Sequence, residues 1–554
     1  MDLIFPNIHP RALDPLISSE SLIQTLRAWT IPSFSIEKVK ELIANALHDI
    51  DLFENCIQQL RARQAALRRD VTRYRSLHSP IRKLPPEILR HIFGYACILD
   101  PAIEYPFQST AFCISSVCSR WRDIALHSPE VWANLNVCLG ERAINPVCLA
   151  VSRSHNYPLS LRVSEAWGQD DACENLFRIL MEQSERWLYV DFSEATSDTV
   201  DMLEGLSLTP LLEDVTLTAY HAPEIFGYIG SAPCLRNVTF QKLEDPIFFD
   251  NFTWETIRHL DMEYDGKLTP ESLFEVLDLG TGLQSLVYRG EARTRLEGSD
   301  PVPYTLFGFD DLPHYTSNLT SFAISLGDSE GFYNLLHDVI MWLTLPSLTD
   351  LSIRHDENPG YRTKCGFTVG GEWPRDVIHG FLNRSGCTLT SLTLEGMPLL
   401  EPDVIALLKL TPSLQSFTLR EMWASDAVVI RPYKPPPQTT FRTVTQALLR
   451  QLEAPIFTSD AFSSQTPLLP KLSRLKLGVQ HHFDAGAEFV DMVRSRWGLP
   501  RDSGIGSGVD TERLREVVLS VMDGKLVEEI YEPLKRLDSE GMMISVFEHD
   551  RRVI

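Results

Sequence analysis

The stretch PSLTDLSI, residues 346–353, carries its apolar residues in a spacing that predicts a β-strand and the turn leading into it. Leu348, Leu351 and Ile353 follow the pattern φ-x-x-φ-x-φ, in which φ is an apolar residue and x is any residue. Alternate residues of a strand point to opposite faces, so Leu351 and Ile353 would share one buried face. Pro346 stands two residues before Leu348 and favours the end of a preceding helix and an extended entry to the strand.

The same pattern occurs eleven times between residues 187 and 519, and the closest starts are 22 to 26 residues apart. The occurrences are Trp187/Val190/Phe192, Leu212/Val215/Leu217, Leu235/Val238/Phe240, Ile257/Leu260/Met262, Leu283/Leu286/Tyr288, Leu319/Phe322/Ile324, Leu348/Leu351/Ile353, Leu389/Leu392/Leu394, Leu414/Phe417/Leu419, Leu472/Leu475/Leu477 and Leu514/Val517/Leu519. This period is typical of leucine-rich repeats. Helical stretches lie between some of the strands, as at residues 270–278 and 402–409.

A strand followed by a helix, repeated many times, predicts a mixed α/β solenoid over residues 136–554, with parallel strands inside and helices outside. The repeats are irregular, and we expect loop insertions at about residues 421–468, which contain RPYKPPPQTTF (431–441), and at 499–511. The asparagine that usually follows the strand motif is absent, so the sequence predicts no asparagine ladder. An α/β domain of another topology is the alternative.

Residues 36–76 predict one long helix with a heptad seam. Twelve positions alternate spacings of three and four, and all but Gln64 are apolar or aromatic: Ile36, Val39, Ile43, Ala46, Ile50, Phe53, Ile57, Leu60, Gln64, Leu67, Val71 and Tyr74. The seam would face a second copy in a homo-oligomer, or it would pack on the helix's own chain. Residues 1–35 contain four prolines and no clean period, so we expect a loosely ordered tail there.

Three short helical stretches follow the heptads. The first, SPIRKLPPEILRHIF (79–93), places two prolines before an apolar helix, where their missing N–H groups cost little. The second runs from Phe112 to Ala125 and would place Ile114, Val117, Trp121 and Ile124 near one face; SPEVW (128–132) closes the region. A unit of this size has a limited core, and a partner would best cover its remaining apolar surface.

The motifs L-P-P-E-I-L-x-x-I-F (84–93), V-C-S-R-W-R-D-I-A (117–125) and S-P-x-V-W (128–132) together resemble an F-box. Their order after a heptad helix is similar to that of F-box-like proteins expanded in mushroom-forming, or basidiomycete, fungi. The resemblance covers about residues 76 to 135, and we take the domain as 77–135. The 18 residues from 94 to 111 form a longer gap than in a compact F-box.

This resemblance implies a non-catalytic substrate-recognition adaptor of a cullin-based ubiquitin ligase. The F-box would dock on the small adaptor subunit of the ligase while the repeats bind a target protein. By analogy, the docking contacts would come from Leu84, Pro85, Ile88, Ile92, Phe93, Val117, Trp121 and Arg122. Two alternatives remain: Ile88, Ile92 and Trp121 form the core of an intramolecular helical packing, or the chain is an interaction scaffold without any part in ubiquitin transfer.

The charge, the apolar runs and the cysteine content of the chain exclude some classes of protein and predict its location. The net charge is −23, and residues 1–100 hold 13 Lys+Arg and 11 Asp+Glu, so the excess acid lies in the rest of the chain. An acidic chain argues against nucleic-acid binding, which needs a basic surface. No apolar run is long enough for a membrane helix, and we expect no secretory signal. Ten scattered cysteines without a C-x-x-C pair indicate reduced thiols and a cytoplasmic or nuclear location.

The sequence contains little that predicts catalysis, and we expect no metal or cofactor. The glycine-rich segment 504–508 follows no strand and lacks the lysine of a phosphate-binding loop. The adjacent His481 and His482 would point apart on a strand, which disfavours a shared metal ion.

Charged residues at the x positions of the repeats predict where a target would bind. Acidic residues occupy these positions in the early repeats: Glu213, Asp214, Asp261 and Glu263. Basic residues lie at or just after the later strands: Arg289, Arg354, Arg420, Arg474 and Lys476. These five predict a docking surface for an acidic or phosphorylated segment. The alternative is that they are ordinary solvated charges.

Overall fold

The computed structural model describes residues 23–24, 27, 36–77, 79–98, 110–165, 171–194, 201–204, 206, 208–218, 222–229, 232–243, 253–264, 270–290, 314–326, 332–355, 373–397, 399–421, 442–454, 468–479, 483–498, 511–522, 525–549 and 551–554. Most of the expected tail, most of both expected loop insertions, the glycine-rich segment and the His481–His482 pair lie outside these residues. Residues 442–454, which fall within the first expected insertion, are described and contain a helix, Gln446–Leu452. The chain divides into two compact units, Met1–Ile92 and Phe93–Ile554.

The first unit contains the long helix α2 (Ile36–Leu77), as the heptads predict. The short helix η1 (Pro80–Lys83) follows it, and then α3 (Pro86–Ile98) begins at the second of the two prolines. The side chain of Arg82 bonds back to the end of α2, with Nε donating to the carbonyl oxygen of Ser76 at 2.8 Å. All twelve seam positions of α2 are exposed.

The second unit begins with three short helices, α4 (Thr110–Val117), α5 (Ser119–Leu126) and η2 (Pro129–Trp132). The single helix expected from Phe112 to Ala125 is therefore wrong, because the chain breaks at Cys118. Cys118 has extended backbone, and its sulfur accepts a hydrogen bond from the Trp121 N–H at the start of α5. The break separates the two halves, so that Ile114 and Ile124 are buried while Val117 is exposed.

A sheet of fifteen strands fills the rest of the second unit, and the order of its strands follows the sequence. Every neighbouring pair is parallel except the last, β16–β17, which is antiparallel. The strands are β1 (Asn134–Leu139), β2 (Leu159–Glu165), β3 (Trp187–Glu194), β4 (Asp214–Thr218), β5 (Asn237–Leu243), β6 (His259–Tyr264), β7 (Ser285–Gly290), β9 (Ser321–Leu326), β11 (Asp350–His355), β12 (Ser391–Met397), β13 (Ser416–Glu421), β14 (Arg474–Val479), β15 (Glu516–Val521), β16 (Met543–Glu548) and β17 (Arg551–Arg552). A separate pair joins β8 (Tyr315–Thr316) to β10 (Leu343–Thr344).

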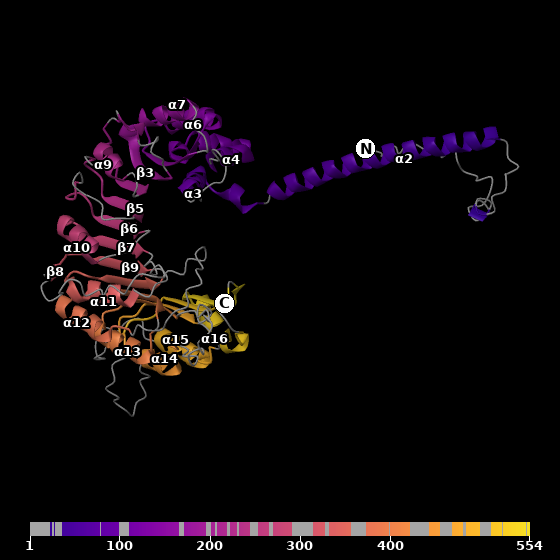
Figure 1. Ribbon diagram of the computed structural model, residues 1–554. Helices are drawn as coiled ribbons and strands as arrows, with labels where there is room; N and C mark the ends of the chain where they lie inside the picture. The colour runs from indigo at the N-terminus through magenta and orange to yellow at the C-terminus, as the bar shows by residue number, and fades with distance from the viewer. Residues whose placement is uncertain are drawn as a thin grey trace. The chain divides into compact units, whose positions relative to one another are not determined.

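Helices cover one side of this sheet, as Figure 1 shows for α9, α10, α12 and α13. They are α6 (Glu141–Ser154), α7 (Asp171–Met181), α9 (Ala222–Ile229), α10 (Pro270–Leu279), α11 (Phe332–Trp342), α12 (Arg375–Ser385), α13 (Glu401–Leu410), α14 (Gln446–Leu452), α15 (Gly486–Trp497) and α16 (Glu528–Ser539). Every apolar residue in the eleven occurrences of the φ-x-x-φ-x-φ pattern is 2% exposed or less. These residues form the core, and the intervening x residues of the strands point to the other side, which we call the open face.

A ladder of backbone hydrogen bonds connects most strands to the next just before the strands begin. The carbonyl oxygen of Thr320 accepts from two N–H groups of the following repeat, those of Thr349 at 2.9 Å and Asp350 at 3.0 Å. Arg236, Gln284 and Gln415 accept two N–H groups in the same way. Backbone carbonyls thus satisfy the N–H groups at the start of these strands.

Side-chain hydroxyls reinforce this ladder in the central repeats. Thr320 donates to the carbonyl of Gln284, Thr349 to that of Thr320, and Thr390 to that of Thr349, at 3.0, 3.0 and 3.3 Å. Ser473 makes the equivalent bond to Gln415 at 3.2 Å. We call these four residues the hydroxyl ladder. They all occupy the first x position of the pattern.

We expect Thr390→Val to lower the free energy of unfolding by about 0.5–1.5 kcal/mol, because valine keeps the shape and the strand preference but removes the hydroxyl that donates to the carbonyl of Thr349. Chemical denaturation monitored by circular dichroism would measure this change. Thr418→Val on β13 is the matched control, since the Thr418 hydroxyl bonds to none of the described residues. Equal stability of the two variants would contradict a stabilising role for the hydroxyl ladder.

Candidate functional site

Helix α3 has two apolar stripes, one buried and one exposed. Leu89, Phe93 and Cys97 recur at a spacing of four and are at most 7% exposed. On another face, Ile88 and Ile92 are 46% and 42% exposed, and Tyr95 and Ile98 are 68% and 66% exposed. A helix needs only one apolar stripe to pack on its own protein, so the second is free for another molecule.

The local sequence explains why this helix forms where it does. Pro86 occupies its first turn, where no N–H partner is lost, and Glu87 places a negative charge near the positive end of the helix dipole. The ring of Phe93 lies 4.8 Å from that of Trp121 on α5. Phe93 therefore belongs to the core of the second unit.

Trp132 connects η2 to the preceding helix, α5, through a hydrogen bond. Its Nε1 donates to the carbonyl oxygen of Ala125 at 2.7 Å, and its ring meets the edge of Phe112. The guanidinium carbon of Arg153 on α6 lies 4.3 Å from the centre of the same ring. These contacts hold the small helices against the beginning of the sheet region.

The eight residues predicted to dock on the ligase adaptor differ in exposure. Pro85, Ile88, Ile92, Val117 and Arg122 are exposed, and Leu84 and Trp121 are half-buried. Phe93 is 1% exposed, so its side chain offers no surface for docking. Sequence reasoning missed Tyr95 and Ile98. Continuing the spacing of three and four past Ile92 would have found them.

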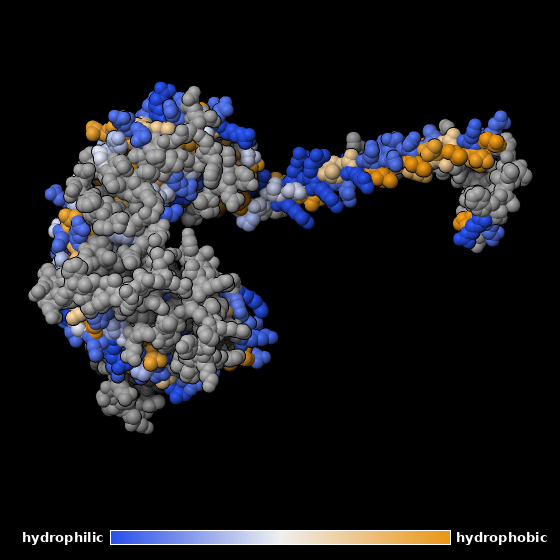
Figure 2. Space-filling view, in the orientation of Figure 1, coloured by the Kyte–Doolittle hydropathy of each residue, from blue (hydrophilic) through white to orange (hydrophobic). Residues whose placement is uncertain are grey.

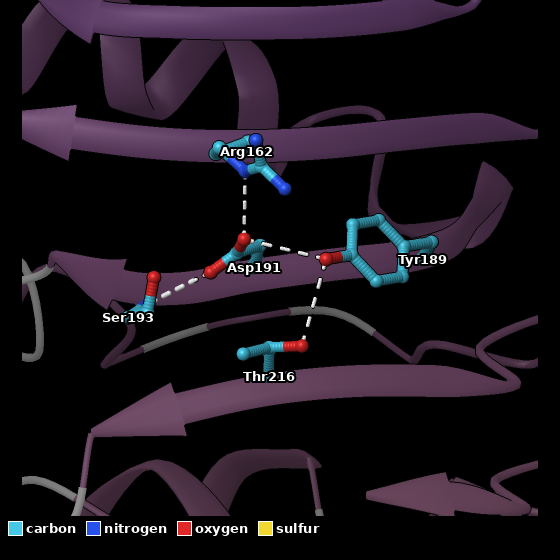
Figure 3. A network of polar contacts seen from close by, with 5 residues as sticks. All are labelled: Arg162, Tyr189, Asp191, Ser193 and Thr216. Atoms are coloured by element: carbon cyan, nitrogen blue, oxygen red, sulfur yellow. Dashed lines mark hydrogen bonds and ion pairs between the residues drawn. The ribbon is translucent and has the colours of Figure 1, made fainter. Parts of the chain in front are cut away.

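The open face of the sheet carries charges whose partners lie on adjacent strands. Arg162 on β2 donates from Nε to Oδ2 of Asp191 on β3 at 2.7 Å (Figure 3). The same carboxylate accepts from the hydroxyl of Tyr189 at 3.3 Å and, through Oδ1, from the N–H of Ser193 at 3.0 Å. Tyr189 also reaches the hydroxyl of Thr216 on β4 at 3.5 Å. Burial raises the pKa of Tyr189, which keeps its hydroxyl protonated as a donor.

This network lies in a sheltered part of the open face. Asp191 is buried, and burial also raises the pKa of the nearby Asp214 carboxyl on β4. Asn237 on β5 donates to Asp214 at 3.3 Å and partly offsets that shift. Arg162, Tyr189, Asp191, Asp214 and Asn237 each have a side-chain partner within the sheet. The cluster therefore links the adjacent strands β2 to β5.

The five cations predicted to bind a target are also placed on the open face, and four of them are paired with acids. Arg289 pairs with Asp261, and Lys476 lies 3.0 Å from a carboxylate oxygen of Glu516. Arg354 and Arg420 both approach Glu395, at 3.8 and 3.9 Å. Arg474 is exposed and has no ion pair in the described part of the chain.

Register explains why two arginines share one glutamate. Arg354 on β11 lies opposite Glu395 on β12, and Glu395 lies opposite Arg420 on β13. Gly478 on β14 is next in the row and makes room for the Arg420 side chain: a Cβ atom there would lie 2.8 Å from Cγ of Arg420. We call Arg354, Glu395 and Arg420 the charge triplet. It holds one more positive than negative charge.

No group of three or more His, Cys, Asp or Glu side chains within the described residues could hold a metal ion. None of the described helices is long and apolar enough to cross a membrane.

Comparison with known proteins places a family match over the small helices. Residues 81–138 match the F-box-like family. The matched residues include α3, α4, α5, η2 and most of β1. No curated protein matches the chain. F-box proteins are generally non-catalytic substrate adaptors, so the match supports a role in protein interaction for this part of the chain.

Proposed function

We propose that the chain is the substrate-recognition adaptor of a cullin-based ubiquitin ligase. The exposed stripe of α3 carries this proposal, because it lies within the F-box-like match and has no use in an intramolecular core. In this role, Ile88, Ile92, Tyr95 and Ile98 contact the small adaptor subunit of the ligase. Leu84, Pro85, Val117, Trp121 and Arg122 are further candidate contacts. Ubiquitin transfer itself would be performed by other subunits, in the cytoplasm or the nucleus.

We further propose that residues 136–554 form an irregular leucine-rich-repeat solenoid that holds the target. The sequential order of the parallel strands and the burial of the repeated apolar residues support this proposal. Holding a target beside the ligase raises the effective concentration of its lysines near the activated ubiquitin. No catalytic residue of this chain is needed for that effect.

The charge triplet is the part of the open face best suited to a phosphorylated or acidic segment. Two guanidinium groups approach one carboxylate at more than 3.5 Å, so neither makes a short hydrogen bond to it. Most of their donors remain available for an anionic ligand. A phosphate group carries more charge and more acceptor oxygens than a carboxylate and would compete well with Glu395.

We expect Ile88→Asp combined with Ile92→Asp to weaken binding of the purified ligase adaptor at least tenfold, because two apolar contacts would become desolvated charges. Calorimetric titration would measure the affinity, and circular dichroism would check that the variant is folded. The control is Leu149→Asp on α6, a leucine with a similar exposure of 40%. Undiminished binding by the double variant would refute docking through α3 and favour a scaffold without a ligase role.

A second pair of variants tests the charge triplet in opposite directions. Arg354→Glu with Arg420→Glu should weaken target capture from cell extract, whereas Glu395→Gln should strengthen it by leaving both arginines without a competing carboxylate. Both effects should shrink as salt concentration rises. The control is Arg494→Glu with Arg536→Glu, because these exposed arginines lie on α15 and α16. If captured proteins are the same for all three variants, the charge triplet is not the recognition site.

A further inference from the structure

The exposed seam of α2 is the largest run of apolar side chains that the proposed ligase role does not use. Its apolar members range from 39% exposed at Val39 to 74% at Ile36 among the large side chains. Figure 2 shows hydrophobic residues following one another along this helix. A seam of this length, sustained over more than five heptads, is typical of a coiled coil.

The charges of α2 are distributed unequally along its length. Residues 36–55 contain five Asp or Glu and two Lys, a net charge of −3. Residues 56–77 contain six Arg and one Asp, a net charge of +5. Two copies side by side in the same direction would bring like charges together in both halves. Two copies in opposite directions would place the acidic half of each against the basic half of the other.

The sizes of the seam residues also favour the antiparallel orientation of two α2 helices. In an in-register parallel pair, Ala46 would meet Ala46 and leave a gap, while Gln64 would meet Gln64 in an apolar layer. In an antiparallel pair, residues of the two heptad positions face each other across the seam. One register fills every layer and sets the small Ala46 against the long Gln64. Its remaining layers are Ile36 with Tyr74, Val39 with Val71, Ile43 with Leu67, Ile50 with Leu60, and Phe53 with Ile57.

We propose that α2 pairs with α2 of a second copy of this chain as an antiparallel coiled coil in this register. Charge and layer size are independent properties of the helix, and both select the same arrangement. The occupant of the seam is thus a second copy, because the helix is complementary to itself when reversed.

The orientation has a consequence for the position of the docking helices. The C-terminal ends of the two α2 helices would lie at opposite ends of the coiled coil, about 60 Å apart for 42 residues at 1.5 Å per residue. Each F-box-like segment begins just after one of these ends. A dimer would therefore carry two separate docking helices and bind two ligase adaptors. Only this stoichiometry rests on the proposed function; the pairing of α2 does not.

Disulfide cross-linking of the full chain tests the orientation. Ile43→Cys and Leu67→Cys are made singly and together, and linked peptides are identified by mass spectrometry, which also distinguishes bonds made by the native cysteines. Within one helix these positions are about 36 Å apart and cannot join. We expect no 43–43 or 67–67 bond from either single variant. We expect a 43–67 bond from the double variant and from a mixture of the two single variants.

Three results would overturn the proposal. Bonds of the 43–43 and 67–67 type would show a parallel pair, a monomer by light scattering at micromolar concentration would show no pair, and a different linked register would show the wrong layers. Arg68→Glu with Arg69→Glu provides a second measurement. This double variant should form a weaker dimer than the unmodified chain at low salt. The two dimer affinities should become equal at high salt. Adaptor binding by α3 is measured separately, so failure of either proposal leaves the other testable.

Discussion

The carbonyl ladder in front of the strands is the constraint on which the sheet region depends. Each ladder carbonyl, such as that of Gln284, accepts from two consecutive N–H groups of the next repeat, here Thr320 and Ser321. If one strand shifted by one residue relative to its neighbour, buried polar groups would lose their partners and the apolar residues would turn to the open face. Strand register is therefore fixed before the strands begin. Insertions of very different length between strands can then be accommodated without changing the pairing.

Fixed register also determines the chemistry of the open face. Because equivalent x positions lie in rows across neighbouring strands, about 4.8 Å apart, a charge on one strand is bound to meet the residue at the same position on the next. Arg162 meets Asp191 in this way, and Arg354 and Arg420 meet Glu395. Most of the open-face cations are consequently neutralised by the sheet itself. An anionic ligand of this surface would compete with these carboxylates, which favours a doubly charged anion over a singly charged one.

Much of this architecture could be predicted from the sequence because it depends on periodic burial. The eleven apolar patterns marked strands β3 to β7, β9 and β11 to β15, and the heptads marked α2. Strands β1, β2 and β16 of the main sheet lie outside the eleven patterns. For β1, Leu135 and Val137 continue the pattern from Trp132, but that residue was interpreted as the end of the helical region. The break at Cys118 could not be predicted, since a single cysteine accepting a backbone hydrogen bond leaves no periodic signal. The pairing of Arg354 with Glu395 could have been predicted by aligning the patterns of adjacent strands, because each residue directly follows the last apolar residue of its pattern.

The exposed apolar side chains are distributed unequally between the helices α2 and α3 and the sheet region. More than half of the large hydrophobic side chains that are exposed in the described residues belong to α2 and α3. The sheet region, in contrast, buries its repeated apolar residues and presents mainly polar groups, so any partner it binds would be recognised by charge and hydrogen bonding. The F-box-like match covers α3 but begins only after the end of α2. The seam of α2 therefore needs an explanation of its own. The opposite charges of its two halves supply one within the chain itself, since a reversed copy satisfies both the apolar seam and the charges beside it.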